Sequence, residues 1–135
     1  MLAFRFLALA VQKLNKMEQL IYKGFIEEKC KGENYDALFI GDMEYPLAEE
    51  FERELQGNQV SVRYWISDAE KTKEQIQEGA LKTIMGIVDA DYGDRCSEIT
   101  GYLWTDEELN IGGHDLLSEL SSYKGKFVYL EIDVH

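Results

Sequence analysis

The sequence predicts a single α+β domain built on a mainly antiparallel sheet with three or four short helices. Segments in which apolar and polar residues alternate, as in strands, are mixed with segments that have helical spacing. The two kinds do not follow each other as regular βαβ units, which favours antiparallel pairing and leaves a small barrel as one form of the sheet. A length of 135 residues suits one domain with one hydrophobic core.

The clearest strand lies at residues 59–67, where Val60, Val62, Tyr64 and Ile66 fall on one face. The closing residues 125–134 alternate in the same way. Weaker strand patterns are found at 19–30, 36–41, 80–90 and 95–104, and residues 31–34 and 89–94 are predicted to form a turn and a loop. No internal repeat is evident in the sequence.

A helix is predicted over residues 46–55. Pro46 can occupy the first turn, where its missing N–H costs nothing, and Leu47, Phe51 and Leu55 follow at four-residue intervals. Gly57 tolerates the positive φ that often ends a helix.

Two further helix starts are predicted from capping boxes, in which two side chains satisfy each other's backbone amides. Ser67 with Glu70 forms one, and Thr105 with Glu108 forms the other. Residues 114–120 are predicted to be a short helix after a pair of glycines, which give the backbone freedom to turn.

The net charge of −12 is the strongest global feature. Residues 1–16 carry three basic and no acidic groups, so residues 17–135 hold 11 basic against 26 acidic groups. Such a field disfavours direct contact with nucleic acid and suits a partner protein with a basic surface, or a cation. The plainer interpretation is that the charge keeps a small protein soluble.

Residues 1–16 are interpreted as an amphipathic helix or a translated leader, ahead of one acidic α+β domain at 17–135. Docking on the core or on a second subunit, which would make the protein a homo-oligomer, is favoured over contact with lipid because only three cations support the latter. No apolar run approaches the ~20 residues that span a bilayer. Cys30 and Cys96 are interpreted as reduced thiols of a cytoplasmic protein, and a disulfide between them is the alternative.

Residues 100–120 combine aromatic, acidic and glycine residues with the one internal histidine. Tyr102 and Trp104 are predicted to share one face of a strand; together with Trp65 they are the candidate binding residues, while burial in the core is the alternative. His114, beside Asp115, is the candidate catalytic residue, acting as a general base with Cys96 or Ser97 as nucleophile; capping a helix is the alternative.

Asp89, Asp91 and Asp94 form a candidate calcium or magnesium site, because hard cations prefer oxygen ligands. The spacing fails the EF-hand pattern, which has a bidentate Glu where Thr100 stands. No phosphate-binding, dinucleotide-binding or hydrolase motif is present, and no cofactor is predicted.

Three functional hypotheses follow. The first is a non-enzymatic, acidic module that binds another protein, with a phage-style inhibitor that imitates nucleic acid as a special case. The second is a divalent-metal-dependent hydrolase that uses the three aspartates and His114. The third is a structural subunit that self-associates through residues 1–16.

Overall fold

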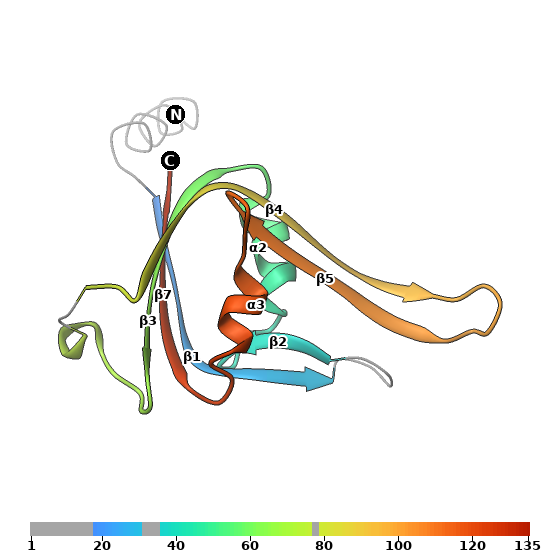
Figure 1. Cartoon of the computed structure of the whole chain (residues 1–135), viewed down its shortest axis with the longest axis horizontal. Coiled ribbons are helices and arrows are strands. Elements are labelled where there is room, and N and C mark those ends of the chain that lie inside the picture. Colours follow the sequence, from blue (N-terminus) through green and yellow to red (C-terminus); the bar gives the residue numbers. More distant parts are fainter. Residues whose placement is uncertain (1–17, 31–35, 77–78) are drawn as a thin grey trace, which may run out of the picture.

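The computed structural model describes residues 18–30, 36–76 and 79–135 (Figure 1). The described residues form one seven-stranded sheet and two α-helices. The strands are β1 (Glu18–Cys30), β2 (Asp36–Ile40), β3 (Gln59–Ser67), β4 (Lys82–Cys96), β5 (Leu103–Ile111), β6 (His114–Asp115) and β7 (Phe127–Val134). The helices are α2 (Leu47–Leu55), α3 (Leu116–Ser121) and a 3₁₀ turn, η1 (Lys73–Gln75).

The sheet has the order β2-β1-β7-β3-β4-β5-β6, and every pairing is antiparallel. Antiparallel pairing was expected, but two different strands end the sheet, so it is open and does not close into a barrel. In Figure 1 the sheet curves around α2 and α3, which lie on its inner side. The expectation of three or four helices was too high for the described residues.

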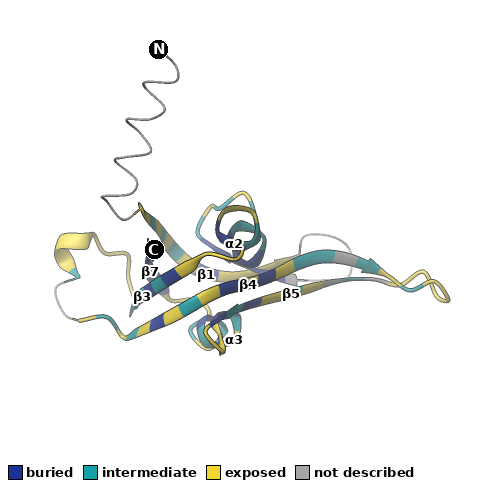
Figure 2. Cartoon of the chain, turned by 90° about the horizontal axis from the view of Figure 1, so that it is seen from above, coloured by how far each residue is buried: buried dark blue, intermediate teal, exposed yellow. Residues whose placement is uncertain are grey.

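The core fills the inner side of the curved sheet. Alternation along β3 buries Val60, Val62 and Tyr64, and α2 contributes its expected apolar face. From the helix, Phe51 is fully buried, and Figure 2 shows that buried residues gather in this central body. Burial of each large apolar side chain contributes about 1.5–3 kcal/mol.

The structure shows an internal repeat that the sequence analysis missed. The order strand, strand, helix, strand occurs as β1-β2-α2-β3 and again as β4-β5-α3-β7. The first six strands of the sheet have the order β2-β1-β7-β3-β4-β5. When β1 is exchanged with β4, β2 with β5 and β3 with β7, the same order is obtained, read from the other end. The registers match as well, since Ile26 pairs with Ile40 as Val88 pairs with Ile111, and Gly24 pairs with Val128 as Gly86 pairs with Val60.

Each repeat has a sharp bend at a glycine in its first strand. β1 pairs with β7 up to Phe25 and with β2 from Ile26 on. A Cβ atom at Gly24 would lie 2.6 Å from the Cα of Gly41, and one at Gly86 would lie 2.4 Å from the Cα of Gly112. Only glycine allows two backbones to come this close while the strand changes its partner.

Several local predictions were wrong. Thr105 and Glu108 belong to strand β5 and do not open a helix. Ser67 ends β3, and the capping box observed in this region joins Thr72 to Gln75 at the start of η1. Residues 89–94, expected to be a loop, continue β4, whereas the chain turns at residues 97–102.

The predicted helix at 114–120 is confirmed as α3, where the Asp115 side chain accepts a hydrogen bond from the backbone N–H of Ser118 at 3.0 Å. The predicted N-terminal helix or leader at 1–16 and the turn at 31–34 lie outside the described residues. Within the described part of the chain, no helix has the length and apolar character needed to cross a membrane.

Alanine at either bend glycine is expected to destabilise the fold. Gly24→Ala and Gly86→Ala would each force a methyl group into facing backbone, at φ values of +150° and +154°. We expect each to lower the free energy of unfolding by about 2–4 kcal/mol, as measured by urea denaturation. Gly79→Ala is the control, because no atom of the described residues lies within 4 Å of a Cβ there. Equal effects at all three positions would contradict the proposed role of the bends.

Candidate functional site

The outer parts of β4 and β5 form a two-stranded arm that projects from the body (Figure 1). We define the arm as residues 89–108. β4 pairs with β3 only up to Ile87, and from Val88 on its one strand neighbour among the described residues is β5. Because β6 pairs only with Asn110 and Ile111, most of the other edge of β5 is open as well. Figure 2 shows the exposed turn at the far end of the arm.

One face of the arm is lined by carboxylates. Asp91 pairs directly with Glu108 across the two strands, and the alternation of strand side chains places Asp89 and Asp106 on the same face. We call Asp89, Asp91, Asp106 and Glu108 the acidic face. Arg95 lies among them and bonds to Asp91 and Asp106, at 3.2 Å in each case.

An aromatic pair lies on the same face, close to the turn. The rings of Tyr102 and Trp104 are stacked, with centroids 6.1 Å apart and planes inclined by 18°. The indole N–H of Trp104 donates to Asp106 at 3.1 Å, and the side chain of Tyr102 is exposed. Ile99 in the turn is 95% exposed. The two predicted aromatic residues are therefore neighbours on the surface and not part of the core.

The base of the arm is tied to the body. Ala90 is buried, and its backbone N–H donates to the side chain of Gln56 at 2.8 Å. On the inner face, Glu107 accepts a hydrogen bond from the backbone N–H of Leu38 in β2 at 3.3 Å. This bond joins β5 to the strand at the opposite end of the open sheet.

Glu107 is also the most perturbed carboxylate of the arm. Burial and, more weakly, the negative charge of Glu28 raise its pKa to about 7, although the Leu38 N–H opposes the shift. Its Oε1 atom is buried without a hydrogen-bond partner among the described residues. The charged form of Glu107 is therefore poorly accommodated in the folded protein.

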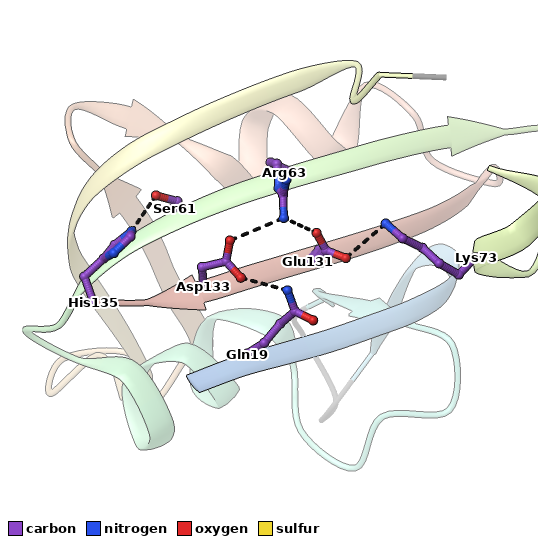
Figure 3. Close-up of polar contacts among 7 residues, drawn as sticks. All are labelled: Gln19, Ser61, Arg63, Lys73, Glu131, Asp133 and His135. Carbon is purple, nitrogen blue, oxygen red and sulfur yellow. Dashed lines mark hydrogen bonds and ion pairs between the residues drawn. The ribbon is translucent and has the colours of Figure 1, made fainter. Parts of the chain in front are cut away.

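Trp65, the third predicted binding residue, lies on the outer face of the body and not on the arm. It meets Tyr129 edge to face, with ring centroids 5.8 Å apart. A polar network runs beside this pair (Figure 3): Arg63 bonds to Glu131 and to Asp133, and Lys73 bonds to Glu131 at 3.0 Å. Gln19 extends the network by donating to Asp133, and Figure 3 shows a separate hydrogen bond between Ser61 and His135.

His114 lies in another polar group, on the body. Its Nδ1 is 3.6 Å from Oε2 of Glu119. The other oxygen of Glu119, Oε1, bonds to Lys82 and accepts a hydrogen bond from the hydroxyl of Tyr64. Cys96 pairs with Leu103 at one end of β5, whereas His114 pairs with Ile111 at the other. Eight residues of strand separate the two positions, roughly 26 Å at about 3.3 Å per residue. The structure therefore does not bring His114 to Cys96 or Ser97.

Asp89 and Asp91 of the predicted metal site lie on one face of β4. Asp91 bonds to Arg95, and the side chain of Asp94 lies outside the described part. Among the described residues, no group of three or more His, Cys, Asp or Glu side chains could hold a metal ion.

The sequence analysis missed Arg95, Asp106 and Glu108 as parts of this site. Polar residues of the arm were interpreted as a loop and as a helix start. The available signal was the alternation of Asp89 and Asp91 with Ala90 and Tyr92, which is the period of a strand.

Comparison with protein-family models, curated proteins and solved structures found no match to the chain.

Glu107→Gln is expected to stabilise the protein at high pH. The folded state holds the Glu107 proton up to a pKa of about 7, whereas the unfolded chain releases it near 4.5. Stability from this group is thus fully present below pH 4.5 and falls as the pH rises through 7. We expect the variant to gain on the order of 1–2 kcal/mol at pH 8 and little at pH 4.5, by urea denaturation.

Glu108→Gln is the matched control, because its side chain is exposed on the next position of the same strand. An equal gain for both variants, or a gain of Glu107→Gln that does not change with pH, would show that burial of Glu107 does not cause the effect.

Proposed function

We propose that this protein is a non-enzymatic module that binds another protein with a basic surface, and that the arm makes the contact. The observation that carries the proposal is the combination of an exposed, stacked aromatic pair and a row of carboxylates on a two-stranded ribbon beyond the core. Aromatic side chains that become buried on binding often supply much of the binding energy.

The charge of the arm supports a basic partner. Residues 89–108 contain seven acidic residues and one basic residue, Arg95. Carboxylates in such a row attract a basic surface over long range and increase the rate of association. Arginine and lysine side chains can also stack on the faces of Tyr102 and Trp104. The same charges repel nucleic acid itself. A protein that binds nucleic acid has a basic surface, and such a surface would attract the carboxylates of the arm.

The geometry of the arm also favours a partner. A two-stranded ribbon is only marginally stable in water by itself, and among the described residues no third strand pairs with either edge of the arm. A bound protein would cover the ribbon and provide new contacts for its exposed groups. The turn presents Ile99, which is almost fully exposed, as a further apolar contact.

The proposal is tested with two variants of the arm, one that lacks two carboxylates and one that lacks the aromatic pair. A chain with Asp91→Asn and Glu108→Gln, and a second with Tyr102→Ala and Trp104→Ala, are compared with the wild type for retention of proteins from cells. We expect one or more basic proteins to be retained by the wild type and at least tenfold less by either arm variant, measured by quantitative mass spectrometry. Retention should weaken steeply with salt if carboxylates imitate a nucleic-acid backbone.

The matched control carries Glu52→Gln and Glu54→Gln in α2, which remove the same charge from another surface. The control should retain the partner as the wild type does. Equal losses in the arm and α2 variants would reduce the interaction to net charge, and unchanged retention in the arm variants would exclude the arm as the contact.

A further inference from the structure

The outer face of the body contains a corner that is suited to an ammonium group. Trp65 of β3 and Tyr129 of β7 are directly paired across the two strands, and their ring planes stand at 80° to each other. The carboxylate of Glu131 lies next to them on β7. We call Trp65, Tyr129 and Glu131 the aromatic corner.

The corner is occupied by a lysine of the same chain. The Nζ atom of Lys73 lies 4.2 Å from the centroid of Trp65 and 5.2 Å from that of Tyr129. It also bonds to Oε2 of Glu131 at 3.0 Å (Figure 3). Two aromatic faces and a carboxylate around one cation form the arrangement by which proteins recognise primary and methylated ammonium groups.

The electrostatics of the corner require a cation. Glu131 is only 5% exposed, and a buried carboxylate is costly unless it is paired. Arg63 bonds to one of its oxygens from β3, and Lys73 bonds to the other. If Lys73 left the corner, one oxygen of Glu131 would lose this ion pair and both rings would lose the ammonium that lies over them.

Lys73 is held on a short turn that places no residue in the core. It belongs to η1, in which no residue is buried, and its own side chain is 46% exposed. A hollow of about 500 Å³ lies beside the corner and shares Trp65 with it; Lys71, Gln75 and Leu81 also line it. Small-molecule sites commonly have this volume, so the hollow offers room for the rest of a ligand.

We propose that the aromatic corner is a binding site for an ammonium group of an external ligand, and that Lys73 is a built-in occupant which the ligand displaces. The ammonium can come from a small amine or from a lysine side chain of a peptide. The site is separate from the arm, so it does not depend on the function proposed for that arm.

The test uses Trp65 as the reporter. The chain has two tryptophans, so Trp104→Phe leaves Trp65 alone. In this background, Lys73→Ala and Lys73→Gln are titrated with tetramethylammonium chloride and with a short peptide that contains one trimethyllysine, and fluorescence is followed against equal concentrations of sodium chloride. We expect saturable binding at least tenfold tighter than in the chain that keeps Lys73, because its own ammonium no longer competes.

Lys124→Ala is the matched control, since it removes an exposed lysine that belongs neither to the corner nor to the hollow; it should bind as the parent does. Glu131→Gln added to Lys73→Ala should weaken binding at least fivefold. Saturation by the peptide and by tetramethylammonium would identify a lysine side chain as a ligand, and saturation by tetramethylammonium alone would identify a small amine. If both Lys73 variants keep the parent's melting curve yet bind neither probe better than Lys124→Ala, the proposal is overturned.

Discussion

Two close contacts between glycine backbones determine the shape of this protein. Gly24 meets Gly41 and Gly86 meets Gly112, each pair at a distance that leaves no room for a Cβ atom. At these points β1 and β4 leave one neighbour and join another, so each long strand belongs to two parts of the sheet. The bends turn the sheet around the helices and so create the inner side on which the core forms.

The repeat places β3 and β7 side by side at the centre of the sheet, where equivalent positions of the two copies face each other. Arg63 pairs with Glu131, its equivalent in the second copy. Two identical charged residues at this point would repel, because directly opposed side chains in an antiparallel pair are close. The two copies instead carry opposite charges, and the resulting ion pair fixes Glu131 beneath the cation of Lys73. The difference in charge between the two copies thus stabilises the centre of the sheet and also places Glu131 in the aromatic corner.

The sequence predicted those elements in which one face is buried. β3, β7 and α2 place apolar residues at the spacing of their own secondary structure, so the pattern and the core agree. The arm gave no such pattern because its outer face is solvated, and residues such as Asp91 and Asp106 are typical of turns when considered alone. Strand pairing overrides that preference.

The errors in the candidate site and the missed repeat also have physical reasons. Thr105 and Glu108 have the spacing of a capping box, but the backbone amides of a paired strand are already part of a ladder, so the motif does not act. The repeat is carried by a few residues, chiefly an Ile-Gly pair at the end of β2 and of β5, while the segments between them differ in length. His114 and Cys96 illustrate a further limit, since only the register of β5 shows how far apart they lie.

Comparison of the two copies shows which part of the chain the fold itself does not require. Among the described residues, the hairpin of the first copy has five strand pairs, from Ile26 with Ile40 to Cys30 with Asp36, whereas that of the second copy has nine. The core needs the second hairpin only near its base, where Ala90 and Leu109 are buried. Beyond that point only Tyr92, among the described apolar side chains, packs against the core, and the ribbon gathers negative charge, which costs stability through repulsion. Arg95 offsets part of that cost by joining Asp91 to Asp106 across the strands. The proposed function accounts for such an extension, because a basic partner would offset the repulsion between the carboxylates and cover the aromatic pair.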